Sequence, residues 1–299
     1  NIDYRMYVSI IVLTNYILMI WYVSTYKDIS LGKSIGVLKQ GKEILYLISA
    51  GFPLLFANLC STLILTLDRQ FVNVLFDTIT YAIYAFAYNM LSLVTVATSA
   101  IATVLYPMLK RLNAEKQAEL LQPLGGAILV FVYAVCIAFF FLEEFVKWFL
   151  PHYTESLQIF RIIFPGLAIS AYITVVLHNY YKIKNKNIIF FRRSLVILII
   201  SFLANMGAYF FVGTPSSISV ASIVTMILWY IYAEQYFVET ISYSRKTNLI
   251  YMLIMMGVFY VATSIKNILI GGVLYGTLFV LVTFVTEKRN IMLICKMLA

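Results

Sequence analysis

Nine long apolar runs dominate this sequence, and most of them are close to the 20 residues that an α-helix needs to cross a bilayer. Helices are the expected form because lipid-exposed backbone must satisfy its own hydrogen bonds, and the alternating strands of an outer-membrane barrel are absent. We therefore predict an all-α polytopic integral membrane protein with about nine transmembrane helices. The predicted spans are 6–26, 44–67, 80–109, 120–142, 157–181, 194–212, 218–241, 249–265 and 268–286.

The composition agrees with a lipid environment. Of the 299 residues, 62% are hydrophobic and 12% are charged, whereas a soluble domain carries about 25% charged residues. A water-soluble globule has too little polar surface to cover so many apolar residues. The last two spans are separated only by Lys266 and Asn267, and we predict a tight hairpin there because one merged helix would be too long.

Basic residues are distributed unevenly between the two sides of the predicted spans. Of the 22 lysines and arginines, 17 fall on one side, and the other side receives Arg5, Arg69, Lys147, Arg161 and Lys266. The positive-inside rule places the C-terminus in the cytoplasm and Asn1 outside. This topology explains the net charge of +9 and argues against a nucleic-acid partner. Because the chain starts outside and without Met, we expect at least one further helix before it.

The connecting segments leave no room for a folded soluble domain, so any function must reside among the helices. One connecting segment, residues 31–45, has an amphipathic pattern. Its apolar side chains recur at helical spacing among basic residues, which predicts an interfacial helix. Its apolar positions are Leu31, Ile35, Leu38 and Leu45.

The sequence contains no signature of catalysis. It has no glycine-rich phosphate loop, no nucleophile elbow and no paired histidines for zinc, and its three cysteines are far apart. The two histidines, His152 and His178, are predicted on opposite sides of the membrane, and we expect His178 to be solvated at a helix end. We therefore predict a protein that is not an enzyme, with no catalytic residues, no metal site and no cofactor.

Polar residues recur at helical spacing inside two of the apolar spans. A stripe of this kind wastes hydrogen-bonding capacity against lipid, so it should face a water-filled cavity or a neighbouring helix. Both interpretations stay open, with the cavity favoured. The stripe of the second span is Asn58, Thr62, Thr66, Arg69 and Asn73, and that of the third is Tyr84, Tyr88, Ser92, Thr95, Ser99, Thr103 and Tyr106.

Four ionisable residues lie within spans or at their ends. Asp68 and Arg69 close the second span, Arg161 lies one turn inside the fifth, and Glu234 lies about two turns from the end of the seventh. Charges of this kind usually face the interior of a helix bundle and mark a pathway, although arginines near the interface also extend toward water. Tyr230, one turn before Glu234, is one expected hydrogen-bond partner for it.

Two helix breakers are predicted to kink helices around a cavity. They are Gly51 with Pro53 near the start of the second span and Pro165 with Gly166 inside the fifth.

Four short motifs, in this order, resemble the central region of Wzx-type polysaccharide flippases, in the superfamily that also contains multidrug and lipid II exporters. They are Gly51-Phe52-Pro53-Leu54, Leu67-Asp68-Arg69, Tyr81-Ala82-Ile83-Tyr84 and Tyr106-Pro107-Met108-Leu109. Members of this family have fourteen helices in two six-helix lobes plus two appended helices. The resemblance implies that this chain corresponds to the last nine of them.

The resemblance also implies a domain organisation. Residues 1–43 would hold the last helix of the N-terminal lobe and the interfacial linker. Residues 44–241 would form the six-helix C-terminal lobe, similar to that of the multidrug exporters. Residues 242–299 would form the two appended helices and a cytoplasmic tail.

The function that the resemblance implies is the flipping of an undecaprenyl-diphosphate-linked oligosaccharide for capsule, O-antigen or exopolysaccharide synthesis. Its setting would be the bacterial cytoplasmic membrane, with membrane lipids and the polysaccharide polymerase machinery as further partners. Arginines suit a diphosphate, while amide and hydroxyl groups suit sugars. The expected substrate-binding residues are Arg69, Arg161, Asn58, Thr62, Thr66, Tyr84, Tyr88 and Ser92, with Asp68 and Glu234 as candidates for ion coupling.

Two alternatives remain at this stage. A multidrug exporter of the same fold would need carboxylates deep in its cavity for cationic substrates, and Glu234 is the main candidate. A membrane-embedded polysaccharide polymerase would need long outer loops, whereas the longest outer connection, around Glu143 to Ser156, is short.

Overall fold

The computed structural model describes residues 4–27, 41–241, 246–287 and 290. The secondary structure of these residues is helical, without a β-strand. The chain divides into two compact units, Asn1–Gly51 and Phe52–Ala299. The division falls at the first predicted helix breaker, but the helix itself, α3, is continuous from Gly41 to Leu75 and contains Pro53.

Nine helical segments of the described residues are long and apolar enough to cross a membrane, as the sequence predicted. Large apolar side chains cover much of the second unit; Trp148 is 83% exposed and Phe211 is 91% exposed. Such a surface is unfavourable in water, so the fold is compatible with a multi-pass membrane protein. Outside the fourth and fifth segments, the helices are α1 (Tyr4–Thr25), α3, α4 (Thr78–Lys110), α10 (Asn187–Phe211), α11 (Pro215–Ile241), α12 (Lys246–Thr263) and α13 (Ile268–Thr286).

The fourth span was predicted as one helix over 120–142. The structure instead has two helices, α5 (Ala114–Val135) and α6 (Ala138–Phe149), which are separated at Cys136 and Ile137 by a tighter turn. After this turn, Phe139 stacks on Phe160, with ring centroids 5.4 Å apart. The break was not predicted because apolar periodicity does not show where a helix tightens to make a tertiary contact.

The fifth span is the most deeply buried of the nine and is built from five short segments. The predicted breaker at Pro165 lies in a 3₁₀ turn, and a π-helical segment follows it. Proline has no N–H to donate within a helix, and a π-segment often marks a functional region. The segments are α7 (Ser156–Ile163), η2 (Phe164–Gly166), α8 (Leu167–Ala171), η3 (Tyr172–Leu177) and α9 (His178–Ile183).

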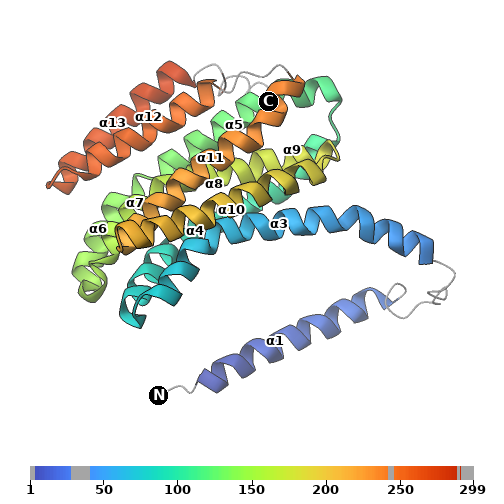
Figure 1. Ribbon diagram of the computed structural model, residues 1–299, viewed down its shortest axis with the longest axis horizontal. Coiled ribbons are helices and arrows are strands. Elements are labelled where there is room, and N and C mark those ends of the chain that lie inside the picture. Colours follow the sequence, from blue (N-terminus) through green and yellow to red (C-terminus); the bar gives the residue numbers. More distant parts are fainter. Residues whose placement is uncertain (1–3, 28–40, 242–245, 288–289, 291–299) are drawn as a thin grey trace. The chain divides into compact units, whose positions relative to one another are not determined.

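The last two spans form the predicted hairpin, and they lie side by side in Figure 1. Asn267 caps α13 by accepting hydrogen bonds from the backbone N–H groups of Leu269 and Ile270. The hydroxyl of Tyr275 on α13 donates to the carbonyl of Tyr133 on α5 at 2.6 Å. This contact joins the hairpin to the remainder of the second unit.

Most of the predicted interfacial helix, residues 31–40, lies outside the described residues, and residues 41–45 form the start of α3. The predicted cytoplasmic tail lies outside them from residue 291 onward. The domain boundaries at residues 43 and 241 stay predictions.

Candidate functional site

The two polar stripes meet in a cavity between α3, α4, the fifth span and α11. Its volume is about 290 Å³, near the lower end of small-molecule sites. We name it the Arg69 cavity. Its lining residues are Thr62, Leu65, Thr66, Arg69, Tyr88, Asn89, Leu91, Ser92, Thr95, Ile163, Gly166, Leu167, Ser170, Ser222, Ile223 and Met226.

The stripe on α4 also borders a second cavity of about 550 Å³, which we name the His178 cavity. Tyr88, Ser92 and Thr95 line the Arg69 cavity, and the next residues of the stripe, beginning at Ser99, line the second one. The stripe therefore borders cavities over most of its length, which favours the cavity interpretation over helix packing. The His178 cavity is lined by Leu54, Asn58, Ser99, Ala102, Thr103, Tyr106, Thr174, His178, Asn179, Lys182, Asn185 and Asn187.

The stripe on α3 is divided between the same two cavities. Thr62, Thr66 and Arg69 line the Arg69 cavity, whereas Asn58 lines the His178 cavity. Arg69 is the eleventh residue after Asn58, which corresponds to about 16 Å along a helix. The structure thus gathers five of the eight expected substrate-binding residues in one place, and Asn58 is not among them.

Asp68 lies behind the wall of the Arg69 cavity and is 1% exposed. Its carboxylate accepts hydrogen bonds from the hydroxyl of Tyr84 at 2.9 Å, from the hydroxyl of Tyr88 and from the backbone N–H of Arg69 at 2.8 Å. Tyr84 is itself buried, and its hydroxyl accepts from Ser219 on α11 at 3.0 Å. Hydrogen bonds of this number explain how a buried carboxylate is tolerated.

Arg69 borders the cavity itself. Its guanidinium carbon is 4.6 Å from the centroid of the Tyr88 ring, and one terminal nitrogen is 3.5 Å from the carbonyl of Leu65. Its Nε has no hydrogen-bond partner, and no described carboxylate lies within ion-pair distance of the guanidinium. The cavity therefore carries a positive charge that forms no ion pair with a described acidic residue.

The structure places Arg161 away from this cavity. Its Nε donates to the hydroxyl of Thr263 at 2.8 Å, and its terminal nitrogen donates to the carbonyl of Tyr260 and to the hydroxyl of Ser264. Tyr260 and Thr263 lie in the last turn of α12, and Ser264 follows it directly. These contacts give Arg161 a role in joining the fifth span to the hairpin.

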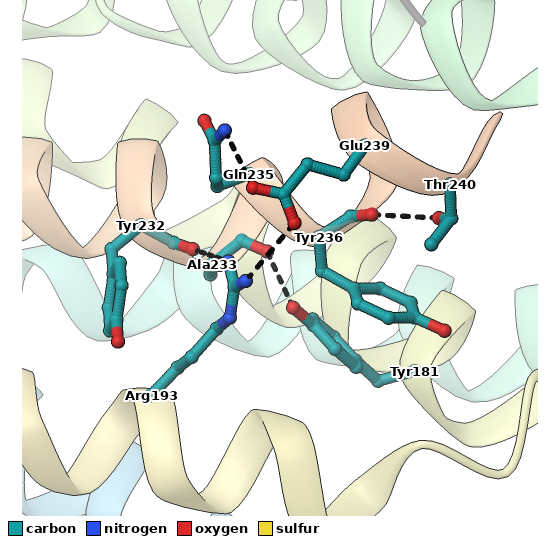
Figure 2. A network of polar contacts seen from close by, with 8 residues as sticks. All are labelled: Tyr181, Arg193, Tyr232, Ala233, Gln235, Tyr236, Glu239 and Thr240. Carbon is teal, nitrogen blue, oxygen red and sulfur yellow. Dashed lines mark hydrogen bonds and ion pairs between the residues drawn. The ribbon is translucent and has the colours of Figure 1, made fainter. Parts of the chain in front are cut away.

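A third arginine, Arg193, joins α10 to α11, as Figure 2 shows. It donates to the carbonyl of Tyr232, lies 4.0 Å from the carboxylate of Glu239 and has its guanidinium carbon 4.9 Å from the Tyr232 ring centroid. The same junction contains a hydrogen bond from Tyr181 to the carbonyl of Ala233 at 2.6 Å. Arg193 and Arg161 are thus committed to contacts between helices, unlike Arg69.

Glu234 is completely buried and does not line the Arg69 cavity. Its carboxylate accepts a hydrogen bond from the hydroxyl of Tyr172 at 2.7 Å, and the same hydroxyl accepts from Asn248 on α12 at 3.3 Å. Tyr230, the partner expected from the sequence, packs its ring edge-on against Tyr172 at 4.9 Å. Glu234 therefore belongs to a buried network that links α11, the π-helical segment and α12.

The expectation that His178 is solvated is wrong. His178 is 8% exposed, and its ring stacks on Phe190 with centroids 5.0 Å apart. The sequence places His178 near the end of an apolar span, but it does not show that α10 packs over that end. Only the neighbouring cluster of polar residues, Asn179, Lys182, Asn185 and Asn187, was a signal that a polar site lies here.

Among the described residues, no group of three or more His, Cys, Asp or Glu side chains is placed to hold a metal ion. Comparisons with protein families, curated proteins and solved structures find no match for this chain.

Proposed function

We propose that this chain belongs to a Wzx-type flippase that moves an undecaprenyl-diphosphate-linked oligosaccharide across the bacterial cytoplasmic membrane. The observation that supports this proposal most directly is the position of Arg69, a half-buried cation that lines a cavity and has no described carboxylate partner. A diphosphate leaves water only when charged donors replace its hydration. Arginine provides such donors in a geometry that fits phosphate oxygens.

The remaining walls of the Arg69 cavity suit the sugar next to the diphosphate. Thr62, Thr66, Ser92 and Asn89 provide groups that donate or accept hydrogen bonds, as sugar hydroxyls require. Leu167 and other apolar residues also line the cavity, and an apolar lining strengthens the interaction between Arg69 and an anion.

In this proposal the second to seventh spans form a lobe similar to that of the multidrug exporters, and α12 and α13 are the appended pair. The C-terminus lies in the cytoplasm, as the distribution of basic residues predicts. Transport proceeds by alternating access, in which the lobe that contains the Arg69 cavity moves relative to a second lobe. Lipid-linked oligosaccharide, membrane lipids and polymerase machinery are the proposed partners.

Asp68 and Glu234 stay the candidates for ion coupling. Asp68 is joined to the cavity through Tyr88, so a change in its protonation would alter a residue that lines the cavity. Glu234 is joined to Tyr172 in the π-helical segment, which separates two short helices of the fifth span. Either carboxylate is therefore in contact with an element that can differ between two transport states.

A multidrug exporter is less well supported, because a cationic drug needs a carboxylate that it can contact. No described acidic residue lines the Arg69 cavity, and the two buried carboxylates lie behind tyrosines. A polysaccharide polymerase is also less well supported. The connection from α6 to α7 contains only the short 3₁₀ turn Pro151–Tyr153 and no room for a catalytic domain.

The test is complementation of a flippase-deficient strain with Arg69→Ala and Arg69→Lys, together with the exposed Arg111→Ala as control. Losing a charge-assisted hydrogen bond costs about 1.5–3 kcal/mol, so export should fall by about tenfold or more in Arg69→Ala at equal membrane abundance. Arg69→Lys should recover part of the activity, and Arg111→Ala should export normally. Lipid-linked repeat units should accumulate on the cytoplasmic leaflet. Normal export by Arg69→Ala would contradict the proposal, and accumulation on the outer leaflet would indicate a polymerase.

A further inference from the structure

The His178 cavity is polar around most of its lining, although it lies among transmembrane helices. Ten of its twelve lining residues carry a polar side chain, contributed by α3, α4, the end of the fifth span, the connection after it and the start of α10. At about 550 Å³ it lies within the range of small-molecule sites. So many polar side chains are unfavourable within the hydrocarbon region of a bilayer unless they have hydrogen-bond partners.

Two buried atoms at this cavity have no hydrogen-bond partner. They are Nε2 of His178, a residue that is 8% exposed, and Oδ1 of Asn187. Most buried polar atoms in proteins are paired, so both are exceptions. Both residues line the cavity, but these two atoms are themselves covered, so a ligand hydroxyl reaches them only when the side chains turn toward it.

The cavity also has a positive charge. Lys182 lies one helical turn after His178 and lines the cavity, and no described acidic residue lines it or forms an ion pair with this lysine. The cationic group favours a ligand that carries an anion, and a compact ammonium group suits phosphate. The cavity thus joins one cation to a dense set of amide and hydroxyl groups.

We propose that the His178 cavity is a binding site for a phosphorylated sugar, in which Lys182 contacts the phosphate and the amide and hydroxyl groups of the lining contact sugar hydroxyls. The inference deepens the proposed function. It rests on that function for the source of the ligand, which is the headgroup of a lipid-linked oligosaccharide. The stripes on α3 and α4 border both cavities. The His178 cavity is therefore a second binding site for the headgroup. Its α3 residue Asn58 lies about 16 Å along that helix from Arg69.

The test uses the fact that the chain has two histidines. Histidine labelled with ¹³C gives two imidazole signals for the protein in nanodiscs, and a His152→Gln variant assigns them. The protein is titrated with glucose 1-phosphate, with polyprenyl-phosphate glucose in the nanodisc, and with inorganic phosphate. Lys182→Gln tests the cation. Lys186→Gln is the control, because Lys186 is exposed and does not line the cavity. Thr103→Val, which removes one lining hydroxyl, is a second variant should Lys182→Gln fail to fold.

We expect a saturable shift of the His178 signal and no shift of the His152 signal. Lys182→Gln should weaken the apparent affinity by about tenfold, Thr103→Val should weaken it less, and Lys186→Gln should leave it unchanged. A shift with both sugar probes shows a site open to free sugar phosphate. A shift with the lipid-linked probe alone identifies the lipid headgroup as the source.

The inference is overturned if neither sugar probe shifts the His178 signal, if inorganic phosphate binds as tightly as the sugar phosphate, or if Lys182→Gln and Thr103→Val both bind normally. These outcomes are independent of the flippase proposal. A protein that flips lipid-linked oligosaccharide without the His178 shift contradicts the inference only. A protein that shows the shift without flipping contradicts the proposed function only.

Discussion

The guanidinium of Arg69 lies 4.6 Å from the centroid of the Tyr88 ring, and the hydroxyl of that ring donates a hydrogen bond to Asp68, the residue before Arg69. One tyrosine on α4 therefore contacts two neighbouring residues of opposite charge on α3. It satisfies the buried carboxylate with its hydroxyl and supports the cation with its ring. This arrangement leaves Arg69 at the cavity instead of in an ion pair with Asp68.

The two contacts of Tyr88 are separable by substitution. Tyr88→Phe should lower the free energy of unfolding by about 1–3 kcal/mol, because the buried carboxylate of Asp68 loses a donor. Tyr88→Leu should cost about a further 0.5–2 kcal/mol, because the ring beneath Arg69 is also lost. Denaturant unfolding of the purified protein measures both. Tyr46→Phe, at an exposed tyrosine on α3, is the control, and equal stability of Tyr88→Phe and wild type would contradict the role of the hydroxyl.

Arg161 and Arg69 should respond in opposite ways to replacement by alanine. Arg161→Ala removes contacts to Thr263, Tyr260 and Ser264 and should destabilise the protein by about 1.5–3 kcal/mol. Arg69→Ala should cost less stability, about 0.5–2 kcal/mol from the lost contact with the Tyr88 ring, and should lower export by about tenfold or more. Unfolding and export are measured for both variants at matched abundance. An Arg161→Ala protein that is fully stable but does not export would contradict the structural role of Arg161 and support its predicted role in substrate binding.

Gly125 should not tolerate a side chain. A β-carbon there would overlap the Tyr172 ring and lie 2.6 Å from Nδ2 of Asn248, both in the network of Glu234. Gly125→Ala should therefore destabilise the protein by about 1–3 kcal/mol through overpacking. Gly257→Ala is the matched control, since no atom lies within 4 Å of its β-carbon, and it should stabilise α12 by about 0.5–1 kcal/mol. Thermal unfolding compares the two, and a stable Gly125→Ala would disprove close packing at Tyr172.

Glu287, just after α13, should make stability depend on pH. Its side chain is buried against Gly126, and burial raises its pKa above the ordinary value of 4.5, although a hydrogen bond from Asn290 opposes part of this change. The folded state therefore holds the proton more tightly than the unfolded state does. The resulting stabilisation is complete below pH 4.5 and is lost as the pH rises through the raised folded-state pKa.

Glu287→Gln replaces the carboxyl group with a neutral group of the same shape. The variant should therefore match wild type below pH 4.5 and unfold at a higher temperature than wild type at neutral pH. Glu119→Gln, at an exposed position, is the control and should show no such difference. A melting temperature of Glu287→Gln that stays equal to wild type at every pH would contradict this account.

Much of the helical architecture was predictable because the apolar runs are long and the breakers are local. The hairpin at Asn267 shows this, since both the cap and the change of direction depend on neighbouring residues. The break between α5 and α6 was not predictable in the same way. It coincides with a stack between Phe139 and Phe160. These residues lie on different helices, so the periodicity within one helix does not show their contact.

The sequence by itself determined the apolar spans, the helices and the polar face of α3 and α4, because hydropathy and a period near 3.6 residues are properties of neighbouring residues. Only the tertiary structure decided what each face meets. It placed the Arg161 side chain against α12, buried His178 against Phe190 and divided the stripes between two cavities. The physical reason is that periodicity shows which side chains share a face of a helix, whereas partners on other helices are chosen by packing across long separations in the chain.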